Sequence, residues 1–194
     1  MDISSVIIVC GPPASGKSFL SKEIASSLHM PLLSKDAIKI NMYDSFRENK
    51  MINDRDISIA SYTILFDMIK QLVSAQVNFV VESNFDYVES VEKMVEIRNE
   101  IDFRSMTIMC NADLKTLHRR FVERDNSDER HPRLVTKKYW DFECFYEKQN
   151  EAKSFLFDIG GKKISYDATE FNQMRINKVL EESKRFISNE NKNT

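Results

Sequence analysis

The stretch Gly-Pro-Pro-Ala-Ser-Gly-Lys-Ser at residues 11–18 constrains this chain more than any other, because it fits the pattern G-x-x-x-x-G-K-[ST]. The apolar run at residues 6–10 precedes it and is typical of a buried parallel strand, and helical spacing of apolar residues follows Ser18. A loop between such a strand and helix points its backbone N–H groups inward, beside the positive end of the helix. The stretch therefore predicts a phosphate-binding loop.

Two side chains of this loop have specific expected tasks. Lys17 would reach the β- and γ-phosphates of a nucleotide, and the Ser18 hydroxyl would ligate the Mg²⁺ that bridges them. We expect contacts to the nucleotide from the whole loop and from the residue after it, namely Gly11, Pro12, Pro13, Ala14, Ser15, Gly16, Lys17, Ser18 and Phe19.

Length and composition favour one cytoplasmic domain. The 194 residues fit a single domain at 1–188 with a frayed tail at 189–194. A net charge of −2 provides no overall attraction for nucleic acid or anionic membranes. Cys10, Cys110 and Cys144 are widely spaced, as expected of reduced thiols. We expect no signal peptide, because the first residues lack a basic region, and no run of 18 consecutive apolar residues is present.

Strand and helix patterns alternate along the chain. Strands are predicted at residues 6–10, 32–33, 77–81, 106–110 and 163–166. Helices are predicted at about 19–28, 37–43, 53–73, 87–99, 114–122, 139–155 and 170–187. This alternation predicts an α/β fold with a mainly parallel sheet, whose ligands bind at the carboxyl ends of the strands.

Asp36 lies where the second predicted strand meets a helix, close to the opening of the phosphate loop. Phosphoryl transfer requires a group that orients the acceptor hydroxyl and receives its proton, and Asp36 is placed to be that general base. Alternatively, Asp36 caps the helix beginning at Ala37, a task that Ser34 also suits. The two roles of Asp36 are compatible.

Two further polar residues follow the third strand. Glu82 would hold Mg²⁺ through water or bind the acceptor; alternatively, it bonds neighbouring backbone amides. Asn84 would position the substrate or simply form a turn. Because the carboxyl ends of parallel strands share one edge, we expect both residues in the same cleft as the phosphate loop.

Positive charge gathers between residues 115 and 138. That segment has eight basic and four acidic residues, a net charge of +4, which leaves −6 for the rest of the chain. Its arginines at 120, 124, 130 and 133 cross a helix end and a polar loop, which favours a hinged lid at 125–136 over a solvated charged face. We expect the arginines within 125–136 to lack protein partners until phosphate arrives, and the lid to be mobile without nucleotide and ordered with it.

Taken together, five stretches resemble the small P-loop kinases. The chain is most similar to a group of predicted kinases that also resembles zeta toxins, chloramphenicol phosphotransferase and the kinase domain of bacteriophage polynucleotide kinase. The stretches are Gly-Pro-Pro-Ala-Ser-Gly-Lys-Ser at 11–18, Leu-Leu-Ser-Lys-Asp-Ala-Ile-Lys at 32–39, Val-Val-Glu-Ser-Asn-Phe at 80–85, Leu-His-Arg-Arg-Phe-Val-Glu-Arg at 117–124 and Arg-His-Pro-Arg at 130–133.

This resemblance implies a P-loop NTPase three-layer sandwich, with a five-stranded parallel sheet of nucleoside-kinase type, a helical lid, and ATP with Mg²⁺ as cofactors. It implies catalytic roles for Lys17, Asp36, Arg120 and Arg124, nucleotide contacts from both arginines, metal binding by Ser18 and Glu82, and an adenine pocket near 167–169. The chain departs from the pattern at Lys39, where polynucleotide kinases carry Arg, and at Glu82, where many relatives carry Asp.

The expected activity is transfer of the γ-phosphate of ATP to a hydroxyl of a small molecule. Asp36, Lys39, Glu82, Asn84, Arg130 and Arg133 are its candidate substrate residues, and Lys39 with Arg47 would hold one phosphate or carboxylate. The alternatives are a 5′-hydroxyl polynucleotide kinase and a catalytically silent ATP-binding regulator. A GTPase is disfavoured because N-K-x-D is absent, and a transporter ATPase because L-S-G-G-Q is absent. A monomer and a homodimer both remain open.

Overall fold

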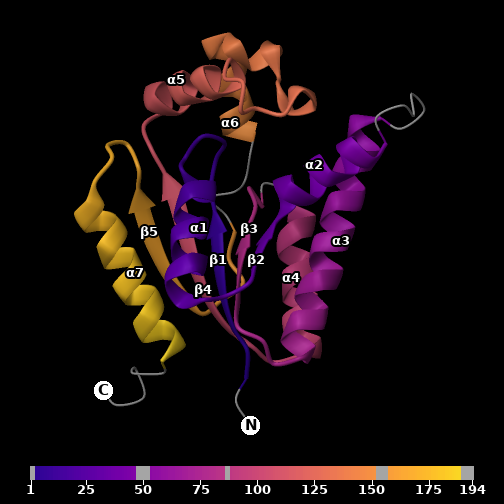
Figure 1. Cartoon of the computed structure of the whole chain (residues 1–194), viewed down its shortest axis with the longest axis vertical. Helices are drawn as coiled ribbons and strands as arrows, with labels where there is room; N and C mark the ends of the chain where they lie inside the picture. The colour runs from indigo at the N-terminus through magenta and orange to yellow at the C-terminus, as the bar shows by residue number, and fades with distance from the viewer. Residues whose placement is uncertain (1–2, 47–52, 86–87, 152–156, 189–194) are drawn as a thin grey trace.

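The computed structural model describes residues 3–46, 53–85, 88–151 and 157–188. Five strands form one parallel sheet in the order β2-β3-β1-β4-β5 (Figure 1). They are β1 (Ser5–Cys10), β2 (Leu32–Ser34), β3 (Phe79–Glu82), β4 (Arg104–Asn111) and β5 (Lys162–Asp167). The central strand β1 pairs with β3 on one side and β4 on the other, which places Val9 level with Glu82 and Ile108. The predicted five-stranded parallel sheet is confirmed.

Helices cover both faces of the sheet (Figure 1). The seven helices of the described chain are α1 (Lys17–Leu28), α2 (Lys35–Ser45), α3 (Asp54–Ser74), α4 (Val88–Glu100), α5 (Leu114–Asp125), α6 (Phe142–Glu151) and α7 (Gln173–Ile187). α1 and α7 pack on one face of the sheet and α3 and α4 on the other, so the three-layer sandwich is also confirmed. Among the described helices, none is long and apolar enough to cross a membrane.

The apolar run of β1 supplies both cores. Ile7 and Val9 belong to the core under α1 and α7, whereas Val6 and Ile8 belong to the core under α3 and α4. All four side chains are fully buried, because successive residues of a strand point to opposite faces and both faces are covered. Burial on both faces explains why this strand is continuously apolar instead of alternating with polar residues.

Side-chain caps fix where several helices begin. Asn53 caps α3 by accepting a hydrogen bond from the Asp56 amide, and Asp113 caps α5 in the same way through the Thr116 amide. α7 begins at Gln173, three residues later than predicted, because Asn172 is its cap. The caps therefore explain why α3 begins where it was predicted and why α7 begins later.

The long aromatic helix predicted at 139–155 is wrong in its first part. The chain instead forms a short 3₁₀ helix, η2 (Lys137–Trp140), and then α6, because the Asp141 carboxylate accepts the Cys144 amide at 2.9 Å and starts a new helix. Residues 152–155 lie outside the described part of the chain. Phe145 is buried against α5 as expected of a core residue, but Phe142 and Tyr146 are exposed.

The apolar face predicted for α3 is narrower in the structure. Ile57, Leu65, Ile69 and Val73 are buried, but Ile64 is 40% and Met68 37% exposed. The buried positions follow four-residue spacing along one stripe, and each exposed residue precedes a buried one by one position, which turns it about 100° away. Ile64 and Met68 are therefore surface residues and not part of the predicted core face.

The pair Leu65 and Ile64 makes this assignment testable. Leu65→Ala should lower the free energy of unfolding by about 2–5 kcal/mol, because it leaves a cavity in the core. Ile64→Ala, on the same helix, should cost less than about 1 kcal/mol. Urea unfolding of both variants measures the difference, and equal losses would contradict the packing described for α3.

Candidate active site

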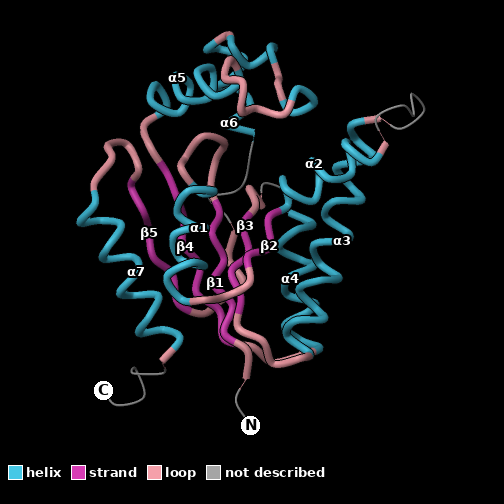
Figure 2. The backbone as a smooth tube through the Cα atoms, in the orientation of Figure 1, coloured by secondary structure: helices cyan, strands magenta, loops and turns pink. Residues whose placement is uncertain are grey.

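The loops that carry the candidate residues gather at the carboxyl ends of the strands. Figure 2 shows the loop from β1 to α1 and the chain leaving β3 at the same end of the sheet, with α5 and α6 above them. Two short 3₁₀ helices follow α5: η1 (Pro132–Leu134) lies within the predicted lid, and η2 comes directly after it. The predicted convergence of the phosphate loop, the start of α2 and the end of β3 is confirmed.

The phosphate loop depends on a glycine that passes close to the neighbouring strand. Gly11 has φ +134°, and a Cβ atom there would lie 2.1 Å from the Cys110 carbonyl oxygen of β4. No side chain fits at that separation, so any other residue would push the loop away from the sheet. Gly16, directly before α1, has φ +80°, which turns the chain into the helix. These two glycines hold the backbone in the concave shape that phosphate binding needs.

Lys17 is buried within this loop. Only 6% of the residue is exposed, and its Nζ donates to the Pro12 carbonyl at 2.8 Å. Burial lowers the pKa of Lys17, while the negative charges of Glu82 and Asp36 oppose that shift. An ammonium with one carbonyl acceptor and a desolvated charge fits a phosphate oxygen as its further partner.

Ser15 supplies a second sign that the loop fits an anion. Its side chain is fully buried, and among the described residues its hydroxyl has no hydrogen-bond partner. A buried hydroxyl without a partner is costly, because water has been removed and nothing replaces it. A phosphate oxygen held by the loop would provide the missing acceptor.

Glu82 joins the phosphate loop to the start of α2. Its two carboxylate oxygens accept hydrogen bonds from the Ser18 hydroxyl at 3.3 Å and the Ser34 hydroxyl at 2.8 Å. Glu82 is 4% exposed, so its carboxylate needs hydrogen-bond partners inside the protein. Among the described residues these partners are the two hydroxyls, and not the neighbouring backbone amides that were the alternative prediction. A hydroxyl beside a carboxylate is the oxygen chemistry that Mg²⁺ prefers, and two protein ligands leave room for phosphate and water.

Asp36 is not the cap of α2. Ser34 takes that task, accepting the Ala37 amide at 3.4 Å, while the Asp36 side chain is 48% exposed and lies 3.5 Å from the Lys35 ammonium. Burial acts to raise the pKa of Asp36, but the summed positive charge around it outweighs that effect and leaves the pKa below its ordinary value. The cations responsible are Lys35, Lys17, Arg130 and Lys39. Asp36 is therefore ionised and available in the cleft at neutral pH.

Two lysines flank Asp36 along α2. Lys39 lies one turn later, with its Nζ 5.6 Å from the centre of the Tyr43 ring, and burial together with Lys35 lowers its pKa. Lys35 lies 5.3 Å from the centre of the Tyr62 ring. Sequence reasoning missed Lys35, although its position directly before Asp36 was a usable signal. Arg47, the expected companion of Lys39, lies outside the described residues.

Arg120, on α5, donates hydrogen bonds to the predicted adenine segment. Its guanidinium donates to the carbonyl oxygens of Ala168 at 2.6 Å and Thr169 at 3.1 Å. Helix α5 and residues 167–169 are therefore neighbours, as an adenine pocket between them would require. Phe19, 48% exposed, meets Phe171 edge to face at 6.3 Å between ring centres. The flat faces of these groups suit a nucleotide base.

The expectation that the arginines within 125–136 have no protein partners was wrong for both of them. The Arg130 Nε lies 3.3 Å from the Asp125 carboxylate, and its Nη2 donates to the Leu134 carbonyl. Arg133 donates to the Asp54 carboxylate at 2.8 Å and lies over the Tyr43 ring. Arg130 still faces the charges of the cleft, but Arg133 is engaged with α2 and α3.

Arg124 remains the most available of the lid arginines. Its side chain is 35% exposed and lies over the Phe121 ring, and among the described residues its buried Nε has no hydrogen-bond partner. Burial and the charge of Arg130 lower its pKa, and Asp36 is among the anions that oppose this shift. Asn84 is half-buried two residues beyond Glu82, at the same end of β3. Both residues lie where the predicted cleft requires them.

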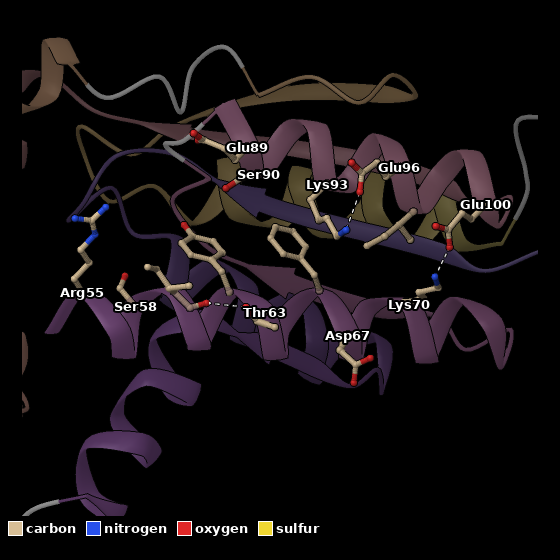
Figure 3. A pocket seen from close by; sticks show the side chains of 14 residues that line it. Arg55, Ser58, Thr63, Asp67, Lys70, Glu89, Ser90, Lys93, Glu96 and Glu100 are labelled. Carbon is tan, nitrogen blue, oxygen red and sulfur yellow. Dashed lines mark hydrogen bonds and ion pairs between the residues drawn. The ribbon is translucent and has the colours of Figure 1, made fainter. Parts of the chain in front are cut away.

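A large groove lies away from this cleft. This groove of about 840 Å³ runs between α3 and α4 (Figure 3). The stacked rings of Tyr62 and Phe66 are among the side chains that line it. An ion pair between Lys70 and Glu100 crosses the groove from one helix to the other. The Tyr62 hydroxyl bonds Ser83 beyond the end of β3, so this side chain stands between the groove and the cleft.

The sheet, the loop and the lid define the nucleoside-kinase-like fold of the small P-loop kinases. The family model described as an AAA domain matches residues 6–142. Because the match covers more than half of the chain, the chain belongs to the AAA domain family. This match contains the phosphate loop, Asp36, Glu82 and the lid through η2.

Solved structures share this fold over nearly the whole chain. A candidate kinase from Chloroflexus aurantiacus is similar with 25% identity and a TM-score of 0.85, over 95% of this chain and 98% of that one. Shikimate kinase from Bacteroides thetaiotaomicron has 15% identity and a TM-score of 0.58, over 95% and 98%. A gluconokinase from Sinorhizobium meliloti has 15% identity and a TM-score of 0.58, over 97% of both chains. No curated protein sequence matches the chain.

The burial of Lys17 leads to a prediction about stability and turnover. Lys17→Met should leave the free protein at least as stable as the wild type, because it removes a desolvated charge but keeps the side-chain volume. The pKa of Lys17 is lowered, so the cost of its charge is present at neutral pH and fades as pH rises toward 10.5. The advantage of Met should shrink over the same range, and thermal unfolding at pH 7 and pH 9.5 measures it.

The same variant should lose stabilisation by MgATP and at least about a hundredfold in turnover, because the ammonium can no longer act on phosphate. Lys22→Met removes the same charge from an exposed position of α1 and should change neither property. A folded Lys17→Met protein with wild-type turnover would refute the role of Lys17.

Proposed function

We propose that this protein is an ATP-dependent phosphotransferase that moves the γ-phosphate to a hydroxyl of a small-molecule acceptor. One observation carries the proposal: an ionised Asp36 shares a cleft with the buried Lys17 of a phosphate loop. Asp36 is free for this task because Ser34, and not Asp36, caps α2. The 25% identity and full-length similarity to a candidate kinase support the same reaction class.

The nucleotide side of the cleft would be built from the phosphate loop. ATP bound with Mg²⁺ supplies the phosphoryl group and neutralises part of its charge. The loop amides and the Lys17 ammonium would hold the β- and γ-phosphates, with Ser18 and Glu82 as the protein's oxygen ligands for the metal. Arg120 and residues 167–169 would border the adenine.

On the acceptor side, Asp36 would orient the hydroxyl and accept its proton at a carboxylate oxygen. Its lowered pKa makes it a weak base, which suits a loose transition state in which the proton leaves late. Arg124 and Arg130, across the cleft from α2, would stabilise the negative charge that develops on the moving group.

The acceptor is proposed to be compact and to carry one anionic group. Lys39 is half-buried, is flanked by Lys35 and Arg130, and has no carboxylate within ion-pair distance among the described residues. A carboxylate or phosphate on the acceptor would stabilise this ammonium. The rest of the chain outside 115–138 has a net charge of −6, which disfavours a long nucleic-acid track. Shikimate kinase and gluconokinase show that this fold accommodates small acceptors.

Asp36→Asn tests the proposed base. The variant should bind MgATP within a few-fold of the wild type and unfold at the same denaturant concentration, because Ser34 provides the cap. Its kcat should fall by about 10²- to 10⁴-fold, since an amide cannot accept the proton. Ser34→Ala serves as the comparison, because it should lower stability by about 1 kcal/mol or more, through loss of the cap and of the hydrogen bond to Glu82. An unstable Asp36→Asn protein with its turnover preserved would make Asp36 structural.

The acceptor is tested by ADP release in the presence of sugars, sugar acids, nucleosides, hydroxyl-bearing antibiotics and a 5′-hydroxyl oligonucleotide. We expect stimulation by small acceptors that carry one carboxylate or phosphate, and Lys39→Met should raise their KM without changing the KM for ATP. Efficient labelling of the oligonucleotide, with turnover falling by decades as salt rises, would favour a polynucleotide kinase. ATP binding without transfer to any acceptor would favour the silent regulator.

A further inference from the structure

A buried carboxylate in the lid has no part in the reaction as described so far. Asp125, the last residue of α5, is 5% exposed, and its side chain is completely covered. Its Oδ2 accepts the backbone amide of Thr136 at 2.9 Å. Its Oδ1 lies 3.3 Å from the Nε of Arg130 and 3.8 Å from the Nη2 of Arg124.

These contacts connect the two ends of the lid to each other. Asp125 and Thr136 are the two ends of the segment predicted as the lid, and the hydrogen bond between them fixes one end against the other. Both arginines that approach Asp125 also lie within electrostatic reach of Asp36. A single buried carboxylate therefore connects the base of the lid to the two cations that face the acceptor side of the cleft.

The charges explain why such a carboxylate is needed. Arg124 and Arg130 repel each other, and the charge of Arg130 is one cause of the lowered pKa of Arg124. Two guanidinium groups in a partly buried place separate into solvent unless an anion lies between them. Before ATP is bound, the carboxylate of Asp125 is that anion.

We propose that Asp125 is a positioning residue, which holds Arg124 and Arg130 in the orientation that meets the transferred phosphate. This role rests on the proposed phosphotransferase activity. Asp125 touches neither ATP nor the acceptor; it acts through the two arginines. Its hydrogen bond to Thr136 also holds the two ends of the lid together, which fixes the loop that carries Arg130 against the end of α5, where Arg124 lies.

The test compares Asp125→Asn with Asp128→Asn. Both substitutions remove one carboxylate charge from the lid, but Asp128 is exposed and bonds neither arginine. Asp125→Asn keeps an oxygen for the Thr136 amide and places an uncharged NH₂ group, which cannot accept a hydrogen bond, between the arginines. Steady-state ADP release, measured at a temperature below both unfolding midpoints, should show a kcat roughly ten- to a hundredfold lower for Asp125→Asn, with KM for ATP changed only a few-fold. Asp128→Asn should match the wild type.

Two further measurements separate positioning from structure. Trp140, the only tryptophan of the chain, lies in η2 just beyond the lid and reports on it by fluorescence. MgATP should change this fluorescence in the wild type and Asp128→Asn proteins, and should do so more weakly in Asp125→Asn. The double variant Asp125→Asn/Arg130→Gln removes one of the two repelling cations, so its loss in kcat should be smaller than the product of the single losses.

Each outcome has one meaning. If Asp125→Asn loses thermal stability but keeps its kcat and its fluorescence response, Asp125 is structural and the positioning role is overturned. If the losses of the double variant simply multiply, the carboxylate does not act through Arg130. If the wild type shows no stabilisation or fluorescence change with MgATP and no turnover, the proposed phosphotransferase activity fails, and the role of Asp125 fails with it.

Discussion

The burial of positive charge at the carboxyl end of the sheet is the constraint on which the rest of the cleft depends. Lys17 is covered on nearly all sides by a loop that lies close to the sheet, because Gly11 passes beside the Cys110 carbonyl. A desolvated ammonium requires negative charge nearby. Glu82, at the end of β3, and Asp36, at the start of α2, supply it. The phosphate loop, the end of β3 and the start of α2 thus meet around one buried positive charge.

Much of this arrangement could be predicted from the sequence. The phosphate loop follows from its glycines and lysine, and the parallel sheet from the alternation of apolar runs with helical patterns. Asp36 and Glu82 were placed in one cleft only because parallel strands end at a common edge. The strand order β2-β3-β1-β4-β5 makes that inference work, since it places β3 between β2 and β1. Their roles in the reaction remain predictions.

What could not be predicted depends on contacts between distant segments. Ser34 is both a helix cap and a partner of Glu82, and only the register of β2 with β3 brings the two side chains together. Likewise, Arg133 finds its partner Asp54 across 79 positions of sequence, so no local pattern could show that it is engaged. The apolar face of α3 was drawn too wide because periodicity marks a stripe but not its edges, which depend on what packs against it.

The charges of the lid also constrain how ATP and the acceptor would share the cleft. Lys17, Lys35, Lys39, Arg124 and Arg130 surround three carboxylates, those of Asp36, Glu82 and Asp125. Positive charge therefore remains in excess before any ligand is bound. An anionic nucleotide would be attracted first to the buried cations of the loop, and this would lessen the repulsion that lowers the pKa of Arg124. Under the proposed function, the charge of Lys39 would remain for the acceptor, so that each ligand would have its own cation.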